Sequence, residues 1–517
     1  MPEKPAAETL TARTARAVQW RLAGAVVGAV SQLAVGVLLA RLLTPADFGV
    51  MAFAFIVLDF ARPLLDLGIG GAVVQRVELT DRHVRTAFTF SLLVGVAVAA
   101  VIAMVAPLGA VAMRNPNVTP ILRVLSVGFA FQAAATVAEA LLRRQLDFRR
   151  LFFIDAGSFV LGYGGVAIVL AFRGYGVWSL VWGSIVQSLL ASGAQLGAVR
   201  HSVRPLLARR ELGDGLHFGI GAALSGCVNY VALNADNFVV GRSIGLTALG
   251  LYSRACTLMN VPYTYAARAM SAVLFPAFAK AQGEPVRLRR GYLLMTRLTA
   301  IVAAPSMGML AIAAPHLVRS LYGLQWTGVV LPLQILCVAG YFRALYHVGG
   351  FVAQSVGWVY RELWRQVVYA AFVIGGAVVG SHYGIPGVAA GVSVAILYMF
   401  VATGHLALRA TGTSWPVYVR VQLSALVTAG VTCGVALAVR LLLEARQTSN
   451  TTSALAVLFA AAIPWTVGIL WNLGDPDFEP LRARLPRWCV RLAQTVHRPR
   501  LLTIQSSLEQ QTFTASR

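Results

Sequence analysis

Long, mostly apolar stretches recur along the chain from Leu22 to Leu473, and no extended polar block separates them. A helix needs about 17 to 25 mostly apolar residues to cross a hydrocarbon layer of about 30 Å with every backbone group bonded internally. Stretches of this length predict an all-α polytopic membrane protein with about 14 transmembrane helices. The predicted spans are residues 22–40, 46–65, 86–111, 119–142, 151–172, 176–199, 216–240, 247–277, 291–314, 327–349, 364–381, 385–408, 416–440 and 453–472.

Composition agrees with a membrane protein and removes several other classes. With 58% hydrophobic and 12% charged residues, the chain lies far from the roughly 25% charged content of a soluble domain. The five cysteines are isolated, and the sequence has no zinc-ligand spacing, phosphate-binding loop or catalytic serine motif. We therefore expect no metal, no cofactor and no enzymatic activity.

The net charge of +23 is spread over loops and does not gather in one patch. Most of the 43 Lys and Arg residues fall in every second loop, in the first 21 residues and in the tail after residue 473. Basic residues are retained preferentially on the cytoplasmic side, so the pattern predicts an even number of spans with both termini in the cytoplasm. Basic residues that follow topology in this way do not indicate nucleic-acid binding.

Two short internal repeats divide the chain. Residues 41–49 (RLLTPADFG) align with residues 242–250 (RSIGLTALG), and residues 175–183 (YGVWSLVWG) align with residues 383–391 (YGIPGVAAG). Both pairs stand six predicted spans apart, which predicts two six-helix halves in parallel orientation, related by an axis along the membrane normal. The predicted segments are a basic amphipathic lead-in (1–21), the first half (22–200), a cytoplasmic linker (201–215), the second half (216–408), an extra helix pair (416–472) and a basic tail (473–517).

These motifs carry a family resemblance. The pattern at residues 41–49, the Asp66-Leu-Gly68 turn and the spacing of polar and glycine residues from Asp236 to Arg254 resemble the bacterial oligosaccharide flippases called Wzx. Residues 143–150 (RRQLDFRR) and 174–179 (GYGVWS) are similar to the colanic-acid-exporter branch of the multidrug, oligosaccharidyl-lipid and polysaccharide exporter superfamily. The resemblance covers roughly residues 20–440. Phe48 stands where a tyrosine is more usual, and the last span pair and the tail match no named pattern.

The resemblance implies a flippase of the bacterial inner membrane that carries an undecaprenyl-pyrophosphate-linked oligosaccharide to the outer leaflet, by alternating access, for exopolysaccharide, capsule or O-antigen synthesis. Membrane lipids, a polysaccharide polymerase and the export machinery are the implied partners. A multidrug or cation antiporter of the same superfamily is the alternative, although its cationic substrates favour acidic residues in the spans. A membrane polysaccharide polymerase is a weaker alternative, because the longest outer loop, near residues 441–453, is too short to fold alone.

Five arginines fall inside predicted spans. Each would cost about 2.5 to 3.5 kcal/mol at the centre of a membrane if it faced lipid, so we expect them to face a polar cavity. The fork of donors on a guanidinium group suits phosphate oxygens, and the lipid pyrophosphate is the part of the implied substrate that hydrocarbon tolerates least. The candidate headgroup residues are Arg62, Arg254, Arg268, Arg297 and Arg343.

Acidic residues in the spans are fewer. Asp59, Arg62 and Asp66 stand at positions i, i+3 and i+7, which places them on one face of a helix. An Asp59–Arg62 ion pair that holds the helix in the bundle and a role in proton coupling are equally open. Asp236, near the end of the seventh predicted span, is a candidate for ion coupling or for structural pairing.

Overall fold

The computed structural model describes residues 10–76, 78–199, 201–262 and 284–473, and within these ranges the protein is built from helices, without a strand. The first helices are α1 (Leu10–Leu42), α2 (Pro45–Asp66), α3 (Ile69–Gln75), α4 (Asp81–Met113), α5 (Val118–Arg144), α6 (Phe148–Ser158), η1 (Phe159–Val166), α7 (Ala167–Phe172), α8 (Val177–Ala198) and α9 (Arg209–Ser243). Residues 246–262 are also helical. The remaining helices are α11 (Pro285–Leu321), η2 (Leu324–Val329), α12 (Val330–Ser355), α13 (Val359–Ser381), α14 (Gly384–Thr411), α15 (Trp415–Ala445) and α16 (Asn450–Leu473).

Eleven helices of the described residues are long and apolar enough to cross a membrane, so the protein is a multi-pass membrane protein. Three of the fourteen predicted spans are not among them. Helix α1 has a shorter apolar stretch, Val27–Leu42, and α9 carries polar residues along its length, which lowers its hydropathy. The eighth predicted span is described only to residue 262. The count of fourteen therefore stays a prediction.

Several helices begin where the sequence supplies a cap. Thr44 precedes α2, and its hydroxyl accepts from the backbone N–H of Asp47 while the Asp47 carboxylate accepts from the Thr44 N–H. This capping box, followed by Pro45 in the first turn, satisfies backbone donors that a helix start leaves unpaired. Helices α8 and α14 begin after or at glycines with positive φ, Gly176 at 53° and Gly384 at 73°. Such angles favour glycine because a side chain would be strained there.

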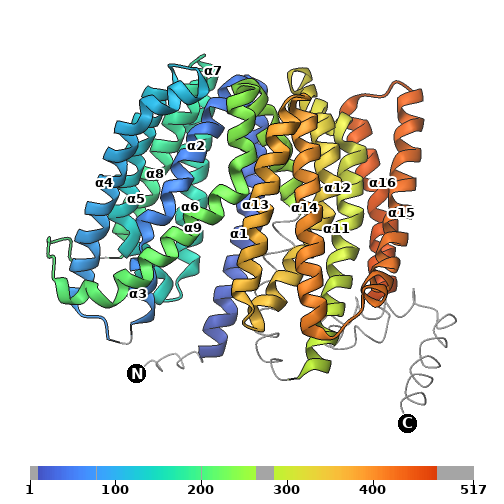
Figure 1. Cartoon of the computed structure of the whole chain (residues 1–517). Helices are drawn as coiled ribbons and strands as arrows, with labels where there is room; N and C mark the ends of the chain where they lie inside the picture. The colour runs from blue at the N-terminus through green and yellow to red at the C-terminus, as the bar shows by residue number, and fades with distance from the viewer. Residues whose placement is uncertain (1–9, 77, 200, 263–283, 474–517) are drawn as a thin grey trace, which may run out of the picture. The chain divides into compact units, whose positions relative to one another are not determined.

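The described helices group into two compact units. The first unit contains the described residues from 10 to 261, together with 318–336 and 363–399. Within it, α5 lies between α4 and α8, and α2 packs along α9 (Figure 1). Segment η1 is a π-helix whose Gly162 faces the backbone of α8: a Cβ at this position would lie 2.6 Å from the Cα of Gln187. Wide π turns inside helices are frequent at functional sites.

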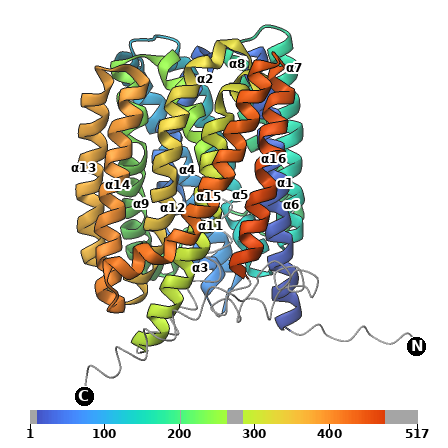
Figure 2. The ribbon, with the colours of Figure 1, turned by 90° about the vertical axis from the view of Figure 1, so that its right-hand side faces the viewer.

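Among the described residues, the second unit contains 262, 284–317, 337–362 and 400–473. Its core includes the fully buried Tyr292 of α11, whose ring stacks on that of Tyr418 of α15 with the centroids 5.8 Å apart. The extra helix pair, α15 and α16, forms a hairpin whose two helices lie side by side (Figure 2). The Trp465 indole N–H donates to the Ile301 carbonyl at 3.1 Å, which ties α16 to α11.

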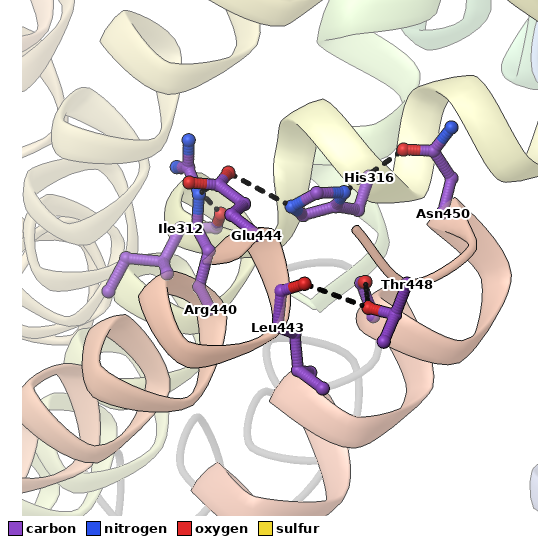
Figure 3. A network of polar contacts seen from close by, with 8 residues as sticks. Ile312, His316, Arg440, Leu443, Glu444, Thr448 and Asn450 are labelled. Atoms are coloured by element: carbon purple, nitrogen blue, oxygen red, sulfur yellow. Dashed lines mark hydrogen bonds and ion pairs between the residues drawn. The ribbon is translucent and has the colours of Figure 1, made fainter. Parts of the chain in front are cut away.

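A network of polar contacts joins α15 and α16 to α11 (Figure 3). The side chain of His316 is only 9% exposed, and its two ring nitrogens lie 3.1 Å from a carboxylate oxygen of Glu444 and 3.1 Å from the amide oxygen of Asn450. Arg440 donates to the same Glu444 carboxylate at 2.9 Å and to the Ile312 carbonyl at 3.3 Å. Because buried polar groups are costly without partners, these bonds fix how α15 and α16 meet α11.

Candidate functional site

The two copies of the first repeat meet in the first unit. Gly49 lies in the first turns of α2, and Gly250 lies at the same place in the helix of residues 246–262. A Cβ on Gly49 would collide with the Leu246 carbonyl and lie 3.2 Å from the Gly250 nitrogen; a Cβ on Gly250 would collide with the Pro45 carbonyl and lie 3.0 Å from the Gly49 nitrogen. The two helices therefore cross backbone to backbone, which glycine alone permits.

Beside this crossing, Arg41 of α1 caps the end of α11, and residues of η2 cap the end of α1. Arg41 donates to the Ser320 carbonyl and, at 2.9 Å, to the Leu321 carbonyl, which are at the end of α11. In return, Gln325 donates to the carbonyls of Ala40 and Leu43 at 3.1 and 3.2 Å, and the Trp326 indole N–H donates to the Ala40 carbonyl at 2.8 Å. The last carbonyls of a helix lack partners within it, so both helix ends are satisfied by the other segment.

We call the region formed by Ala40, Phe48, Gly49, Gly250 and Trp326 the repeat junction. Phe48 and Trp326 are both buried, and their rings meet edge to face with the centroids 5.3 Å apart. Edge-to-face pairs of this kind are favoured by the quadrupoles of the two rings. The junction thus joins segments from both copies of the first repeat and from η2 through glycine packing, hydrogen bonds and aromatic contact.

Arg254 lies beside the repeat junction. It follows Gly250 by four residues, hence by about one turn on the same helical face. Its guanidinium carbon stands over the Phe48 ring, 4.1 Å from the centroid. A Cβ on Gly36 of α1 would lie 3.6 Å from an Arg254 Nη, so the missing side chain of Gly36 gives the guanidinium room. The hydroxyl groups of Tyr163 and Tyr322 interact electrostatically with the Arg254 guanidinium group.

Two further predicted arginines lie in the second unit. Arg297 of α11 donates to the Asn472 side-chain oxygen of α16 through Nε at 3.2 Å and Nη at 3.0 Å. Arg343 of α12 interacts with the neighbouring side chains of Tyr346 and His347, whose rings stack 4.4 Å apart. These two guanidinium groups therefore have different partners, and Arg297 engages an amide of the extra helix pair.

Arg62 and Asp59 form an ion pair of 3.4 Å on α2, with Arg62 65% exposed and Asp59 34% exposed. The side chain of Asp66 and the whole of Arg268 lie outside the described part of the structure. The buried Asp236 of α9 accepts from the Tyr252 hydroxyl at 2.7 Å and from the Asn237 backbone N–H at 2.8 Å. These contacts tie Asp236 to the helix of residues 246–262. Among the described residues, no group of three or more His, Cys, Asp or Glu is placed to hold a metal ion.

The sequence predicts Arg254 as a candidate but does not indicate the residues around it. Phe48 was noticeable only as a departure from the usual tyrosine of its motif. Trp326 is a single aromatic residue in a short connection, and its hydrogen-bond partner Ala40 is 286 residues away. Tyr163 belongs to a glycine-rich stretch, residues 159–166 (FVLGYGGV), whose π-helical winding has no hydropathy signature. None of these residues has a charge or a metal-binding group that would mark it in a sequence.

The fold and these motifs define a known class. Residues 38–331, more than half of the chain, match the family model described as polysaccharide biosynthesis protein. The chain therefore belongs to this family of polysaccharide biosynthesis proteins, and the predicted resemblance to Wzx-type proteins is confirmed.

Among curated proteins, the lipopolysaccharide biosynthesis protein WzxC of Escherichia coli K12 is 24% identical over 66% of this chain and 71% of its own length. The teichuronic acid biosynthesis protein TuaB of Bacillus subtilis 168 is 28% identical over 58% of this chain and 62% of its own length. The succinoglycan biosynthesis transport protein ExoT of Rhizobium meliloti 1021 is 28% identical over 56% of this chain and 58% of its own length. The matched region covers less than two thirds of the length of TuaB and of ExoT.

Solved structures show the fold. The lipid II flippase MurJ in an inward closed conformation aligns with a TM-score of 0.70 at 14% identity, over 88% of this chain and 99% of MurJ. An inward-facing multidrug resistance transporter of the MATE family aligns with a TM-score of 0.61 at 18% identity, over 74% of this chain and 95% of its own. The predicted all-helical membrane fold is confirmed at this level.

Proposed function

We propose that the protein is a flippase that carries a polyprenyl-pyrophosphate-linked oligosaccharide from the cytoplasmic to the outer leaflet of a bacterial inner membrane, for the synthesis of an exopolysaccharide, capsule or O-antigen. Membership of a polysaccharide biosynthesis family and the name of the transport protein ExoT support this function. The observation that carries it is Arg254, whose guanidinium carbon stands over the Phe48 ring of α2 and whose Nη lies beside Gly36 of α1.

A guanidinium group in a span is costly unless it has polar partners in the protein or a polar ligand, and its fork of donors fits a phosphate group. We infer that Arg254 binds the pyrophosphate, and we keep Arg62, Arg268, Arg297 and Arg343 as further candidates. Arg297 then has a second role, because its bond to Asn472 links α11 to α16. Asp59, Asp66 and Asp236 stay candidates for ion coupling or structural pairing. The polyprenyl tail remains in the bilayer, and no covalent step is required of the protein.

We also infer an architecture of fourteen spans, with half-bundles at residues 22–200 and 216–408 joined by a linker at 201–215, the extra pair at 416–472, the lead-in at 1–21 and the tail at 473–517. Equivalent positions of the repeats support two parallel halves. Gly49 and Gly250 occupy matching places and face each other. Gly176 and Gly384 both have positive φ at the start of their helices. Rocking of the two halves would provide alternating access.

The loop charges favour cytoplasmic termini. With a negative cell interior, outward movement of an anionic headgroup is favourable by about 2.3 kcal/mol per charge per 100 mV. A cysteine at the exposed Asn117 should then react with an impermeant thiol reagent on intact cells, and one at the exposed Gln145 should not, in a chain without native cysteines. The reverse labelling would invert the proposed orientation. A polysaccharide polymerase and the export machinery are the partners we propose.

Charge selectivity separates this function from a cation antiporter. If Arg254 and the other arginines line the substrate path, the field there is positive and favours anionic ligands. Purified protein should bind geranylgeranyl pyrophosphate saturably, more weakly at higher ionic strength, and should not bind the cation ethidium. Equilibrium titration of each ligand at two salt concentrations measures this. Tight binding of ethidium, with indifference to the pyrophosphate, would favour the antiporter.

A further inference from the structure

We propose that Phe48 and Trp326 position Arg254 for the phosphate group, and that they tie this binding group to the repeat junction. The proposal rests on the function inferred above. Three contacts in the first unit form a chain: the Arg254 guanidinium stands over the Phe48 ring, the Phe48 ring meets Trp326, and the Trp326 indole N–H is bonded to Ala40. The Phe48 ring therefore contacts both the proposed headgroup-binding residue Arg254 and Trp326 of the repeat junction.

The glycine crossing explains why Arg254 meets Phe48. Gly49 and Gly250 bring the two helices to backbone contact, which places the residue before Gly49 beside the turn that follows Gly250. Phe48 is that residue on α2, and Arg254 is one turn beyond Gly250. Because the capping box of Thr44 and Asp47 fixes the start of α2, the Phe48 ring has a defined position against the arginine.

Contact with a ring prepares a guanidinium group for phosphate. The Phe48 ring attracts the positive charge of Arg254 through its π face and carries no hydrogen-bond acceptor that would compete with a phosphate for the five N–H donors. The arginine is thus restrained by the ring while its donors are left for a phosphate. It also loses less side-chain freedom when the ligand binds, which strengthens binding by pre-organisation.

Trp326 holds the other side of this arrangement. It is fully buried, contacts Phe48 at 5.3 Å and Tyr322 at 5.7 Å between ring centroids, and is anchored to the end of α1. Separation of η2 from α1 would break the bond to Ala40 and remove the edge contact that steadies Phe48. Arg254 would then lose its contact with a fixed Phe48 ring. Opening of the repeat junction should therefore weaken phosphate binding, which links headgroup release to the movement of these segments.

The test is the affinity of purified full-length variants for geranylgeranyl pyrophosphate. Phe48→Leu keeps an apolar side chain but removes the π face, and should weaken binding about three- to tenfold, the range of a partly buried cation–π contact. Trp326→Leu should weaken binding in the same direction. Phe48→Tyr retains the ring and should restore affinity to near that of the natural protein. The matched control is Phe53→Leu, the same change at a buried ring of α2 that contacts Phe238.

A double-mutant cycle separates positioning from a general loss of structure. In an Arg254→Gln background, Phe48→Leu should have no further effect on affinity, because the group that it positions is gone. An equal loss in both backgrounds, or an equal loss from Phe53→Leu, would overturn the proposal. If the natural protein binds no pyrophosphate at all, the proposed function fails. If the natural protein binds and Arg254→Gln weakens binding while Phe48→Leu does not, only the positioning role fails.

Discussion

Arg254→Gln is expected to abolish polymer export while the protein stays at its normal level in the membrane. Glutamine keeps much of the length and polarity of arginine but removes the positive charge, the cation–π contact with Phe48 and the fork of donors. Hydrogen bonds to charged groups contribute about 1.5 to 3 kcal/mol each, so the loss of two to a phosphate would lower substrate affinity by two or more orders of magnitude.

Export is measured as surface polymer in a strain that lacks the natural gene, and protein level by immunoblot of membranes. The matched control is Arg123→Gln on α5, an exposed arginine that donates to the Ala103 carbonyl, which should export normally. A parallel fall of export and abundance in Arg254→Gln would indicate a structural arginine instead. Normal export would exclude Arg254 from the headgroup site.

Gly49→Ala is expected to have the second largest effect, on stability and on export together. The added methyl group would collide with the Leu246 carbonyl and press on the Gly250 nitrogen, and both obstacles are backbone atoms that cannot turn aside. Overpacking in a tight interior costs about 1 to 3 kcal/mol and sometimes more. We expect a lower thermal unfolding midpoint, lower abundance and little export, because the repeat junction can no longer close.

Gly193→Ala is the control for this change. Gly193 also lies within a membrane helix, α8, but nothing stands within 4 Å of the position of an added Cβ. Alanine favours the helix over glycine by up to about 1 kcal/mol, so this variant should be as stable as the natural protein or more so. If Gly49→Ala unfolds at the same temperature as the natural protein and exports normally, the backbone crossing does not matter for function.

Most helices could be predicted from the sequence because each contains an apolar stretch long enough to cross a membrane. Such a stretch is visible directly in the hydropathy of the sequence. The sequence predicted less well where polar residues enter a helix, as in α9, or where winding changes within a continuous apolar stretch, as in η1. Both cases depend on what packs against the helix, since a neighbour can shelter polar groups or accept a wider turn.

The candidate site shows the same division. Arg254 was predictable because a charge within a span needs a reason. The Phe48 ring beneath it was not predictable, because the contact of Phe48 with Arg254 joins segments about 200 residues apart. Each copy of the repeat is also too short to be a strong sequence signal by itself. Arg297 looked equivalent to Arg254 in the sequence, yet it bonds to Asn472 of α16. The sequence identifies charged side chains that are costly in a membrane span, and only the packing of the helices shows which residues each of them contacts.

Translocation of a lipid-linked glycan by the purified protein tests the central claim most directly. The protein is reconstituted into vesicles that contain a polyprenyl-pyrophosphate oligosaccharide with a fluorescent tag on the sugar, and an impermeant quencher is added outside. We predict that the natural protein exposes the inner-leaflet pool to the quencher, and that vesicles with Arg254→Gln behave like protein-free vesicles. If vesicles with the natural protein also retain a protected pool equal to that of protein-free vesicles, the proposed flippase function is contradicted.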